Sequence, residues 1–475
     1  MGILTVEDII KATGGKVVYG NGNSPVFKGV SIDSRTILQN EIFFALRGQR
    51  FDGHDFLNEV ISKGAGGALV ETRLRIPPQL IRGSRFTIIK VPDTLRALQD
   101  LAHFLRVRQK IPIIAITGSN GKTTTKEMSY AILSRRFRVH KNEGNLNNHI
   151  GVPLSLLKIK PEDEVAVFEL GMNASGEIRR LCEILAPTHG VITNIGTAHI
   201  GKLGSLEAIR DAKLEVLQGL DTAIVNADDD FLMQGIKGFK GKIITFSINS
   251  NSDVKAEDVV ITENGSRFIL RFSDSLGGKK DDVSINVNLN VHGIFNIYNA
   301  LAASAVCYSL GIPIDEIKGS LEAYTAFPMR FEVIRKKGII LINDSYNANP
   351  SSMREALNGL IRFVRGSSPE GKGRLIAVLG DMAELGEFSE ELHRSVGRMV
   401  KEFGMDVFIA VGEMMRHAVE EAKGGSGIAI YTFRDASQAA ENIVGILREG
   451  DTILVKGSRL MAMERIVERI SRVEG

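Results

Sequence analysis

The residues best suited to chemistry form a short glycine-rich turn, Thr117-Gly-Ser-Asn-Gly-Lys-Thr-Thr124, between an apolar run and a segment of helical spacing. In such a turn, successive backbone N–H groups and the helix N-terminus attract phosphate oxygens. A lysine there can reach the β- and γ-phosphates, and a threonine can bind Mg²⁺. The turn therefore predicts a nucleoside triphosphate site made of Gly118, Ser119, Asn120, Gly121, Lys122, Thr123 and Thr124.

This turn is shorter than the common phosphate-binding loop, which has four residues between its two glycines. Here only Ser119 and Asn120 separate Gly118 from Gly121, and Ile116 stands where the first glycine would be. The shorter loop disfavours an ordinary GTPase or motor ATPase and indicates a more specialised enzyme. A purely structural glycine turn is the alternative, and the apolar strand before it and the helix after it favour the nucleotide site.

Two further polar residues are candidates for a metal site. Glu169 directly follows the apolar run 165–168, so its carboxylate should lie at the C-terminal edge of a sheet, where Mg²⁺ would find a hard oxygen ligand. The alternative is a solvated acid at a strand end. His199 follows the run 191–194 and should reach the same edge, although a lone histidine is more often structural. Lys213, on the helical segment 206–217, is expected from spacing alone to be a solvated lysine.

The segments around these residues predict a doubly wound α/β domain. Continuous apolar runs, as central parallel strands require, are separated by helix-length segments; they span 111–116, 165–168, 191–194 and 223–226. Residues 254–291 alternate apolar and polar side chains around the loop 277–282, which predicts an antiparallel extension of the sheet. A helix over 294–310 closes this domain, and 327–329 is the expected linker.

Smaller α/β patterns flank this domain. Before it, strands at 42–46 and 67–70 alternate with helical patterns at 6–13 and 55–63, and a connecting helix is expected over 94–109. After it, a smaller doubly wound sheet lacks the Gly-x-Gly-x-x-Gly turn of a dinucleotide site. Its predicted strands span 338–343, 374–379, 407–411, 428–432 and 452–456, and its helices lie near 351–362, 389–402, 414–422, 436–447 and 460–470.

The predicted fold class is α/β with three domains, because 475 residues are too many for one hydrophobic core. Residues 1–90 would form a small N-terminal α/β domain, residues 91–327 the central doubly wound P-loop ATPase domain, and residues 328–475 a C-terminal Rossmann-like domain.

Charge and composition exclude several classes of function. With 59 basic and 56 acidic residues the formal charge is +3, so nucleic acid is not an expected partner. Cys182 and Cys307 are too far apart for a zinc site and are expected to be buried thiols. The N-terminus does not have the pattern of a secretory signal, and no run of about 18 apolar residues predicts a membrane span. We therefore expect a cytoplasmic protein.

A larger set of motifs resembles the Mur ligase family, in order and across nearly the whole chain. These motifs are 118–123, 145–148, 169–171, 194–199, Lys213, 292–296 and 344–350. In the outer domains, the segments 33–35, 43–48, 51–55, 380–387, His393 and 456–459 resemble the branch of the family that adds D-alanyl-D-alanine. The chain also lacks the Asp-Asn-Pro-Arg motif of a diaminopimelate-adding relative.

The resemblance implies roles that spacing alone does not give. Lys213 would be carbamylated and would bind a second Mg²⁺, while Glu169 and His199 would hold the two metal ions. Asn296 would face the adenine of ATP, Asp344 the ribose and Arg330 the phosphates. The predicted catalytic residues are Lys122, His199, Lys213 and Arg330. The predicted substrate contacts are Ser34, Arg35, Arg47 and Gly48 toward the UDP end, with Asn145, Asn147, Asn347 and Asn349.

The implied reaction is ATP-dependent amide formation through an acyl phosphate, in the synthesis of the peptidoglycan precursor. The implied substrates are UDP-N-acetylmuramoyl-tripeptide and D-alanyl-D-alanine, and nothing in the sequence demands more than a monomer. Rival enzymes are a sibling that adds diaminopimelate or lysine, a folylpolyglutamate synthetase, and a lipid II amidotransferase subunit, whose inserted cysteine cluster is missing here. A rival of another class is a regulatory ATPase. Whether the tripeptide ends in lysine or diaminopimelate stays open.

Overall fold

A computed structural model describes residues 4–20, 26–77, 86–273, 282–336, 338–367, 373–424 and 427–472. The chain forms two compact units. The first comprises Met1–Ala115, Phe137–Met172 and Gly176–His189, and the second comprises Ile116–Arg136, Asn173–Ser175 and Gly190–Gly475. Most of the predicted loop at 277–282 lies outside the described residues.

The N-terminal part of the first unit is built on a five-stranded sheet in the order β2-β7-β6-β5-β4. The strands are β2 (Lys16–Tyr19), β7 (Thr87–Val91), β6 (Gly67–Glu71), β5 (Glu41–Phe44) and β4 (Gly29–Ser31), with a separate ribbon of β1 (Leu4–Thr5) and β3 (Val26–Phe27). Its helices are α1 (Val6–Thr13), η1 (Gly53–Phe56), α2 (Leu57–Ser62) and α4 (Thr94–Arg106). Apolar side chains of β5, β6 and β7 pack with α2 in one core. The predicted strands and helices here are confirmed within a few residues.

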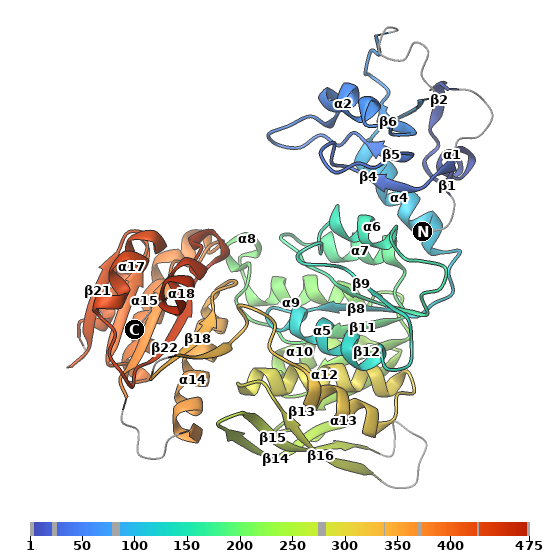
Figure 1. The fold of residues 1–475 in the computed structure, drawn as a ribbon. Helices are drawn as coiled ribbons and strands as arrows, with labels where there is room; N and C mark the ends of the chain where they lie inside the picture. Colours follow the sequence, from blue (N-terminus) through green and yellow to red (C-terminus); the bar gives the residue numbers. More distant parts are fainter. Residues whose placement is uncertain are drawn as a thin grey trace. The chain divides into compact units, whose positions relative to one another are not determined.

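The central sheet has nine strands in the order β16-β15-β14-β13-β12-β11-β8-β10-β9 (Figure 1). They are β8 (Ile113–Thr117), β9 (Val139–Lys141), β10 (Val165–Glu169), β11 (His189–Ile192), β12 (Thr222–Asn226), β13 (Lys242–Ser247), β14 (Val254–Thr262), β15 (Gly265–Phe272) and β16 (Val283–Leu289). Strands β14, β15 and β16 are antiparallel, which confirms the predicted extension. Strand β11 ends two residues earlier than predicted, and β13 was not predicted.

The helices around this sheet are α5 (Lys122–Leu133), α6 (Gly151–Leu156), α7 (Glu177–Leu185), α8 (Ile200–Leu203), α9 (Leu206–Leu214), η2 (Glu215–Leu217), α10 (Asp230–Gly235), η3 (Ile236–Gly238), α12 (Ile294–Ser309) and α13 (Ile314–Ala323). Helix α12 packs against α5, the helix that follows the glycine-rich turn. Eleven of the sixteen residues of α12 are buried, because its sequence is apolar or small on almost every side. The helix that follows the glycine-rich turn is therefore packed against a largely buried helix.

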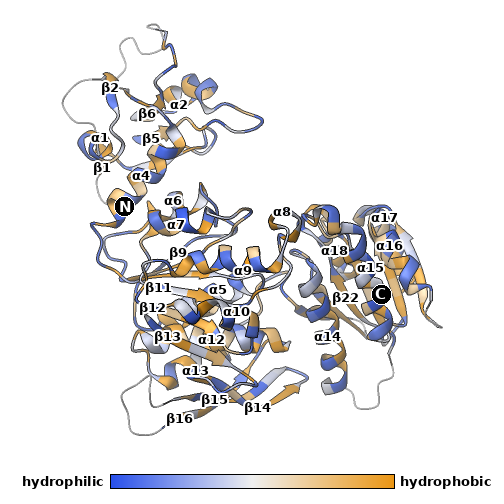
Figure 2. Cartoon of the chain, turned by 180° about the vertical axis from the view of Figure 1, so that it is seen from behind, coloured by the Kyte–Doolittle hydropathy of each residue, from blue (hydrophilic) through white to orange (hydrophobic). Residues whose placement is uncertain are grey.

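The C-terminal sheet has the order β17-β18-β22-β19-β20-β21, and all neighbours are parallel except β17 and β18. Its strands are β17 (Glu332–Lys336), β18 (Ile339–Asp344), β19 (Leu375–Gly380), β20 (Val407–Val411), β21 (Ala429–Phe433) and β22 (Thr452–Lys456). Its helices are α14 (Pro350–Ser367), η4 (Gly386–Phe388), α15 (Ser389–Glu402), α16 (Met415–Ala422), α17 (Ala436–Asn442), η5 (Ile443–Gly445), η6 (Arg459–Met461) and α18 (Glu464–Ser471). Figure 2 shows hydrophobic strands in this sheet and hydrophilic residues on the helices beside it.

The five predicted strands of this sheet are confirmed, and β17 was missed. Every residue of β20 and β22 is buried, as expected for central parallel strands. Strand β17 instead lies at an edge, and its last two residues, Arg335 and Lys336, are exposed. An edge strand with charged residues has no continuous apolar run to reveal it. No helix among the described residues is long and apolar enough to cross a membrane.

Candidate active site

The glycine-rich turn connects β8 to α5 in a conformation that only glycine can adopt at two positions. Gly118 has a φ of 147° and Gly121 a φ of 82°. A Cβ atom at Gly118 would lie 1.8 Å from Oγ1 of Thr193, and one at Gly121 would lie 2.2 Å from Oδ1 of Asn299. Both glycines are therefore required by backbone conformation and by close approach to neighbouring side chains.

The segment that follows β11 holds this turn in place. Thr193 Oγ1 donates to the carbonyl of Asn120 at 2.5 Å, and the backbone N–H of Asn120 donates to Asn194 Oδ1 at 3.0 Å. Ser119 Oγ donates to the carbonyl of Gly196 at 3.0 Å and accepts from its N–H at 2.7 Å. These bonds fix the turn from the side, and Asn194 takes up the N–H groups of both Ser119 and Asn120.

The cationic groups predicted to meet ATP phosphates lie at the start of α5. Lys122 Nζ donates to the carbonyl of Gly118 at 2.7 Å. Arg330 Nη2 donates to Thr123 Oγ1 at 3.0 Å, and its guanidinium carbon lies 3.9 Å from the centre of the Tyr346 ring. Arg330 thus reaches Thr123 from the segment before β17, and its contact with the phosphates stays a prediction. Its neighbours Met329 and Phe331 have left-handed φ angles of 61° and 55°, which is strained backbone for such side chains.

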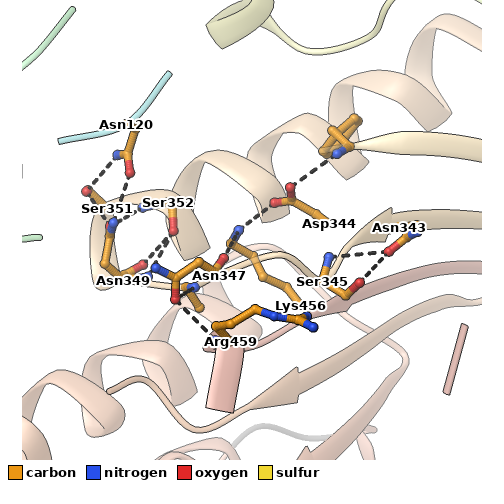
Figure 3. Close-up of polar contacts among 12 residues, drawn as sticks. Asn120, Asn343, Asp344, Ser345, Asn347, Asn349, Ser351, Ser352, Lys456 and Arg459 are labelled. Atoms are coloured by element: carbon orange, nitrogen blue, oxygen red, sulfur yellow. Dashed lines mark hydrogen bonds and ion pairs between the residues drawn. The ribbon is translucent and has the colours of Figure 1, made fainter. Parts of the chain in front are cut away.

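A second polar group joins the end of β18 to the end of β22 (Figure 3). Asp344 Oδ2 lies 2.6 Å from Lys456 Nζ, and Asp344 Oδ1 accepts from the N–H of Phe331 at 3.1 Å. Lys456 is buried and also donates to the carbonyl of Asn347 at 2.9 Å. Asp344 and Lys456 are in register on adjacent parallel strands, which explains why they meet. Lys456 belongs to the motif 456–459, but neither the motif nor the spacing predicted a partner for it.

The start of α14 brings the C-terminal part of the second unit to the glycine-rich turn (Figure 3). Asn349 Nδ2 donates to Asn120 Oδ1 at 2.9 Å, and Asn120 Nδ2 donates to Ser351 Oγ at 3.0 Å. Asn349 also caps α14, since its Oδ1 accepts from the N–H of Ser352 at 2.9 Å. Asn120 therefore links the glycine-rich turn to the start of α14.

The predicted adenine contact, Asn296, lies near the start of α12 and is buried. Its Nδ2 donates to the carbonyl of His292 at 2.8 Å, and its Oδ1 accepts from Asn299 Nδ2 at 3.1 Å. Thr125 Oγ1 donates to Asn299 Oδ1 at 3.3 Å. Asn299 thus links Asn296 to α5. Asn299 was not among the predicted site residues, although its position three residues after Asn296 places both on one helix face.

Lys213 is 1% exposed, so the expectation from spacing that it would be solvated is wrong. The buried residues of α9 are Ile209, Ala212 and Lys213, and therefore Lys213 occupies the core face of its helix. Its spacing of four residues from Ile209 could have indicated this. Burial, together with the nearby charge of Lys122, holds the pKa of Lys213 well below the ordinary lysine value. Both effects favour the uncharged, nucleophilic form of the amine.

In the first unit, Glu169 ends β10 and is buried, which argues against the alternative of a solvated acid. Its Oε1 accepts from Asn147 Nδ2 at 2.9 Å. Its backbone N–H donates to Asn142 Oδ1 at 2.9 Å, and Asn142 also donates to the carbonyl of Leu146. Asn145 in the same loop is exposed. The structure thus brings Glu169 and Asn147 together, and the asparagine fixes the orientation of the carboxylate.

His199 precedes α8 with a left-handed φ of 66°. Its Nδ1 lies 2.8 Å from Oε2 of Glu384, which is in the loop after β19. No group of three His, Cys, Asp or Glu side chains suited to a metal ion occurs among the described residues. A metal site would therefore need other ligands, such as the hydroxyl of Thr123 and a modified Lys213.

Comparison with known proteins identifies the family. The model named "Mur ligase family, catalytic domain" matches residues 26–106, "Mur ligase middle domain" matches 116–307, and "Mur ligase, glutamate ligase domain" matches 329–459. The UDP-N-acetylmuramoyl-tripeptide–D-alanyl-D-alanine ligase of Escherichia coli is 39% identical over 453 residues, which cover 93% of each chain. The chain belongs to the Mur ligase family. The Bacillus subtilis ligase of the same name is 34% identical and covers 98% of this chain and 97% of its own.

Solved structures of Mur ligases agree with the fold. A crystal structure of MurF from Acinetobacter baumannii has a TM-score of 0.87 at 31% identity, covering 99% of this chain and 100% of that chain. MurF ligase from Thermotoga maritima in complex with ADP has a TM-score of 0.80 at 27% identity, covering 94% of this chain and 97% of that chain. The predicted family and three-domain α/β fold are confirmed.

In this Mur ligase, the residues predicted to meet the UDP end form two polar groups in the segments that follow β4 and β5. Ser34 Oγ donates to Glu59 Oε2 at 2.8 Å, and Arg35 is exposed and pairs with Asp33 at 2.7 Å. The hydrogen bonds from Arg35 lower the pKa of Asp33 to about 2. In the second group, Arg47 pairs with Asp52 at 2.8 Å, and the N–H of Gly48 donates to the carbonyl of Phe51 at 2.9 Å. Their contacts to a substrate stay predictions.

Proposed function

We propose that this Mur ligase is an ATP-dependent, ADP-forming ligase that joins D-alanyl-D-alanine to UDP-N-acetylmuramoyl-tripeptide. The observation that carries this proposal is full-length similarity to ligases of that name, up to 39% identity, together with a nucleotide-binding turn of the required geometry. The product is the UDP-linked pentapeptide, a precursor of peptidoglycan. The enzyme acts in the cytoplasm as a monomer, and its domains span 1–90, 91–327 and 328–475.

The reaction proceeds in two steps because a carboxylate is a poor electrophile. An oxygen of the tripeptide carboxylate first attacks the γ-phosphorus of ATP, and the bond to the β–γ bridging oxygen breaks to release ADP. The free amine of D-alanyl-D-alanine then attacks the acyl carbon. Inorganic phosphate leaves with the electrons of the C–O bond, and the amine proton is lost as the amide forms. Phosphoryl transfer of this kind depends on positioning and on charge stabilisation.

The turn and the residues around it supply this stabilisation. Lys122 begins α5, and Arg330 reaches Thr123 in the first turn of that helix. Both cations balance charge that spreads over the transferring phosphoryl oxygens. Asn296 faces the adenine and Asp344 the ribose. The remaining backbone and side-chain groups of the turn bind the phosphates. The substrate contacts are Ser34, Arg35, Arg47, Gly48, Asn145, Asn147, Asn347 and Asn349.

The residues present fit a metal site that uses a modified lysine. Thr123 offers a hydroxyl, Glu169 a carboxylate and His199 an imidazole. The amine of Lys213 is buried and its pKa is lowered, which favours the uncharged form that attacks CO₂ to give a carbamate with loss of a proton. The carbamate converts an amine into an oxygen ligand. Two Mg²⁺ ions, when bound there, would neutralise charge on the β- and γ-phosphates.

Phosphate release tests the proposed function. Release from ATP is measured with Mg²⁺ and UDP-N-acetylmuramoyl-tripeptide, with and without D-alanyl-D-alanine, and the product is weighed by mass spectrometry. Release that requires both substrates and yields a UDP-linked pentapeptide is the expected result. Release that is indifferent to both substrates would instead identify a regulatory ATPase. Parallel assays with lysine-ending and diaminopimelate-ending tripeptides determine which is the preferred substrate.

Asp344→Ala is expected to raise the KM for ATP by about 10- to 150-fold, since a hydrogen bond to a charged group contributes about 1.5–3 kcal/mol. The KM for D-alanyl-D-alanine should not change. The substitution also leaves buried Lys456 without its carboxylate partner, which lowers stability. A double variant, Asp344→Ala with Lys456→Met, should recover stability and keep the high KM. An unchanged KM for ATP in Asp344→Ala would remove Asp344 from the ribose site.

A further inference from the structure

Within the second unit, the loop after β19 makes a second contact with the nucleotide-binding part, away from Asn120. Glu384, in this loop, has a left-handed φ of 63°. Its Oε1 lies 2.8 Å from Lys202 Nζ on α8, and its Oε2 lies 2.8 Å from His199 Nδ1. Lys202 Nζ also donates to Asn173 Oδ1 at 2.9 Å. The carboxylate of Glu384 therefore contacts both the imidazole of His199 and the ammonium of Lys202.

The backbones beside these side chains touch directly. A Cβ atom at Gly201 would lie 2.2 Å from the carbonyl carbon of Leu385 and 2.3 Å from the nitrogen of Gly386. Gly386 has a φ of 56°, and a Cβ there would lie 2.9 Å from the carbonyl oxygen of Gly201. Neither position has room for a side chain. The loop and α8 are therefore held at a separation set by main-chain atoms, which places Glu384 opposite His199 and Lys202.

The carboxylate at this distance selects a state of the His199 ring. A neutral imidazole carries its proton on either Nδ1 or Nε2, and an unprotonated Nδ1 would direct its lone pair at a negatively charged oxygen 2.8 Å away. That arrangement is repulsive, so Glu384 favours the proton on Nδ1. The lone pair of Nε2 then remains for a ligand. Metal-binding histidines commonly have a carboxylate on their other nitrogen in this way, and its loss typically costs 10–100-fold in metal affinity.

We propose that Glu384 is a positioning residue that sets the tautomer and orientation of His199 when the C-terminal sheet docks on α8. Metal binding at His199 is thereby coupled to the contact between α8 and the loop after β19, which belongs to the same sheet as Asp344 and Lys456. The inference rests on the proposed function, in which His199 is a metal ligand. The competing explanation is an ordinary surface ion pair, because Glu384 is 42% exposed and exposed pairs stabilise little.

The test uses the full-length protein with Mn²⁺ as the metal probe and a non-hydrolysable ATP analogue. Mn²⁺ affinity is measured by electron paramagnetic resonance, and the His199 tautomer by ¹⁵N NMR, with the His199 signal assigned from a His199→Asn variant. Glu384→Ala should weaken Mn²⁺ binding about tenfold and move His199 away from the Nδ1–H tautomer. Lys202→Met keeps the carboxylate beside His199, and its effect on both readouts should be smaller.

A glycine pair provides a control that leaves Glu384 intact. Gly201→Ala places a methyl group against the loop and should weaken Mn²⁺ binding as Glu384→Ala does. Gly319→Ala, on α13, meets no atom within 4 Å and should change nothing. Unchanged Mn²⁺ affinity and tautomer in a folded Glu384→Ala variant would overturn the proposal. Unchanged Mn²⁺ affinity in His199→Asn would overturn both this inference and the metal role of His199. The proposed function would still stand if the wild-type enzyme, assayed alongside, joins D-alanyl-D-alanine to the UDP-linked tripeptide.

Discussion

Lys122→Met is expected to lower kcat for ligation by about 10³-fold, the size of effect seen when one group that stabilises transition-state charge is removed. Lys122 begins α5, directly after the turn, and its Nζ donates to the carbonyl of Gly118 at 2.7 Å. A neutral carbonyl is a weaker partner for an ammonium than phosphate oxygens are. ATP should therefore draw Nζ onto the β- and γ-phosphates, and methionine of similar length cannot replace that charge.

The Lys122 prediction is tested by phosphate release and by pentapeptide formation at saturating ATP. Lys237→Met is the matched control, because it makes the same substitution at an exposed lysine of η3. The control should retain wild-type kcat, and both variants should melt near the wild-type temperature. If the kcat of Lys122→Met for ligation is within tenfold of the wild-type value, Lys122 does not stabilise the transferring phosphoryl group. The assignment of the turn as the phosphate-binding site is then wrong.

The parts of the fold that the sequence predicted are those with one strong local pattern. Strands such as β8 and β10 are buried on both faces, and their continuous apolar runs are visible without knowledge of the partners. The glycine-rich turn was predictable because backbone conformation restricts Gly118 and Gly121 to one residue type. In each case the cause lies within a few residues of the effect.

The parts that were missed depend on partners far away in the chain. Lys456 looks solvated until β22 pairs with β18, which brings Asp344 to its ammonium across 112 positions of sequence. Asn299 similarly links Asn296 to α5 only because it accepts a hydrogen bond from Thr125 on that helix. Glu384 meets His199 only because two glycines allow the backbones to touch. The roles of these residues follow from tertiary pairing, which spacing along one segment does not encode.

Lys213→Ala is expected to lower ligation by about 10²-fold or more, because it removes a ligand of the proposed metal site. The buried amine lies near Lys122, and both burial and that charge favour its uncharged form. Only an uncharged amine reacts with CO₂, so its depressed pKa extends carbamate formation to lower pH than an ordinary lysine allows. Wild-type activity should accordingly fall in buffers stripped of CO₂ and return when bicarbonate is added.

Chemical rescue separates this role from a structural one. Lys213→Ala leaves a space in the core face of α9 that a small carboxylate can enter, so formate or acetate should restore part of the activity. Lys213→Met fills the same space with an apolar side chain and should be inactive without rescue, although it should be the more stable variant because burial of a methionine leaves no cavity. Rescue of Lys213→Ala alone would place a carboxylate at this position in the working enzyme. If Lys213→Ala is as active as the wild type, no second metal depends on Lys213. If wild-type activity does not change when CO₂ is removed and bicarbonate is added, the proposed carbamate is wrong.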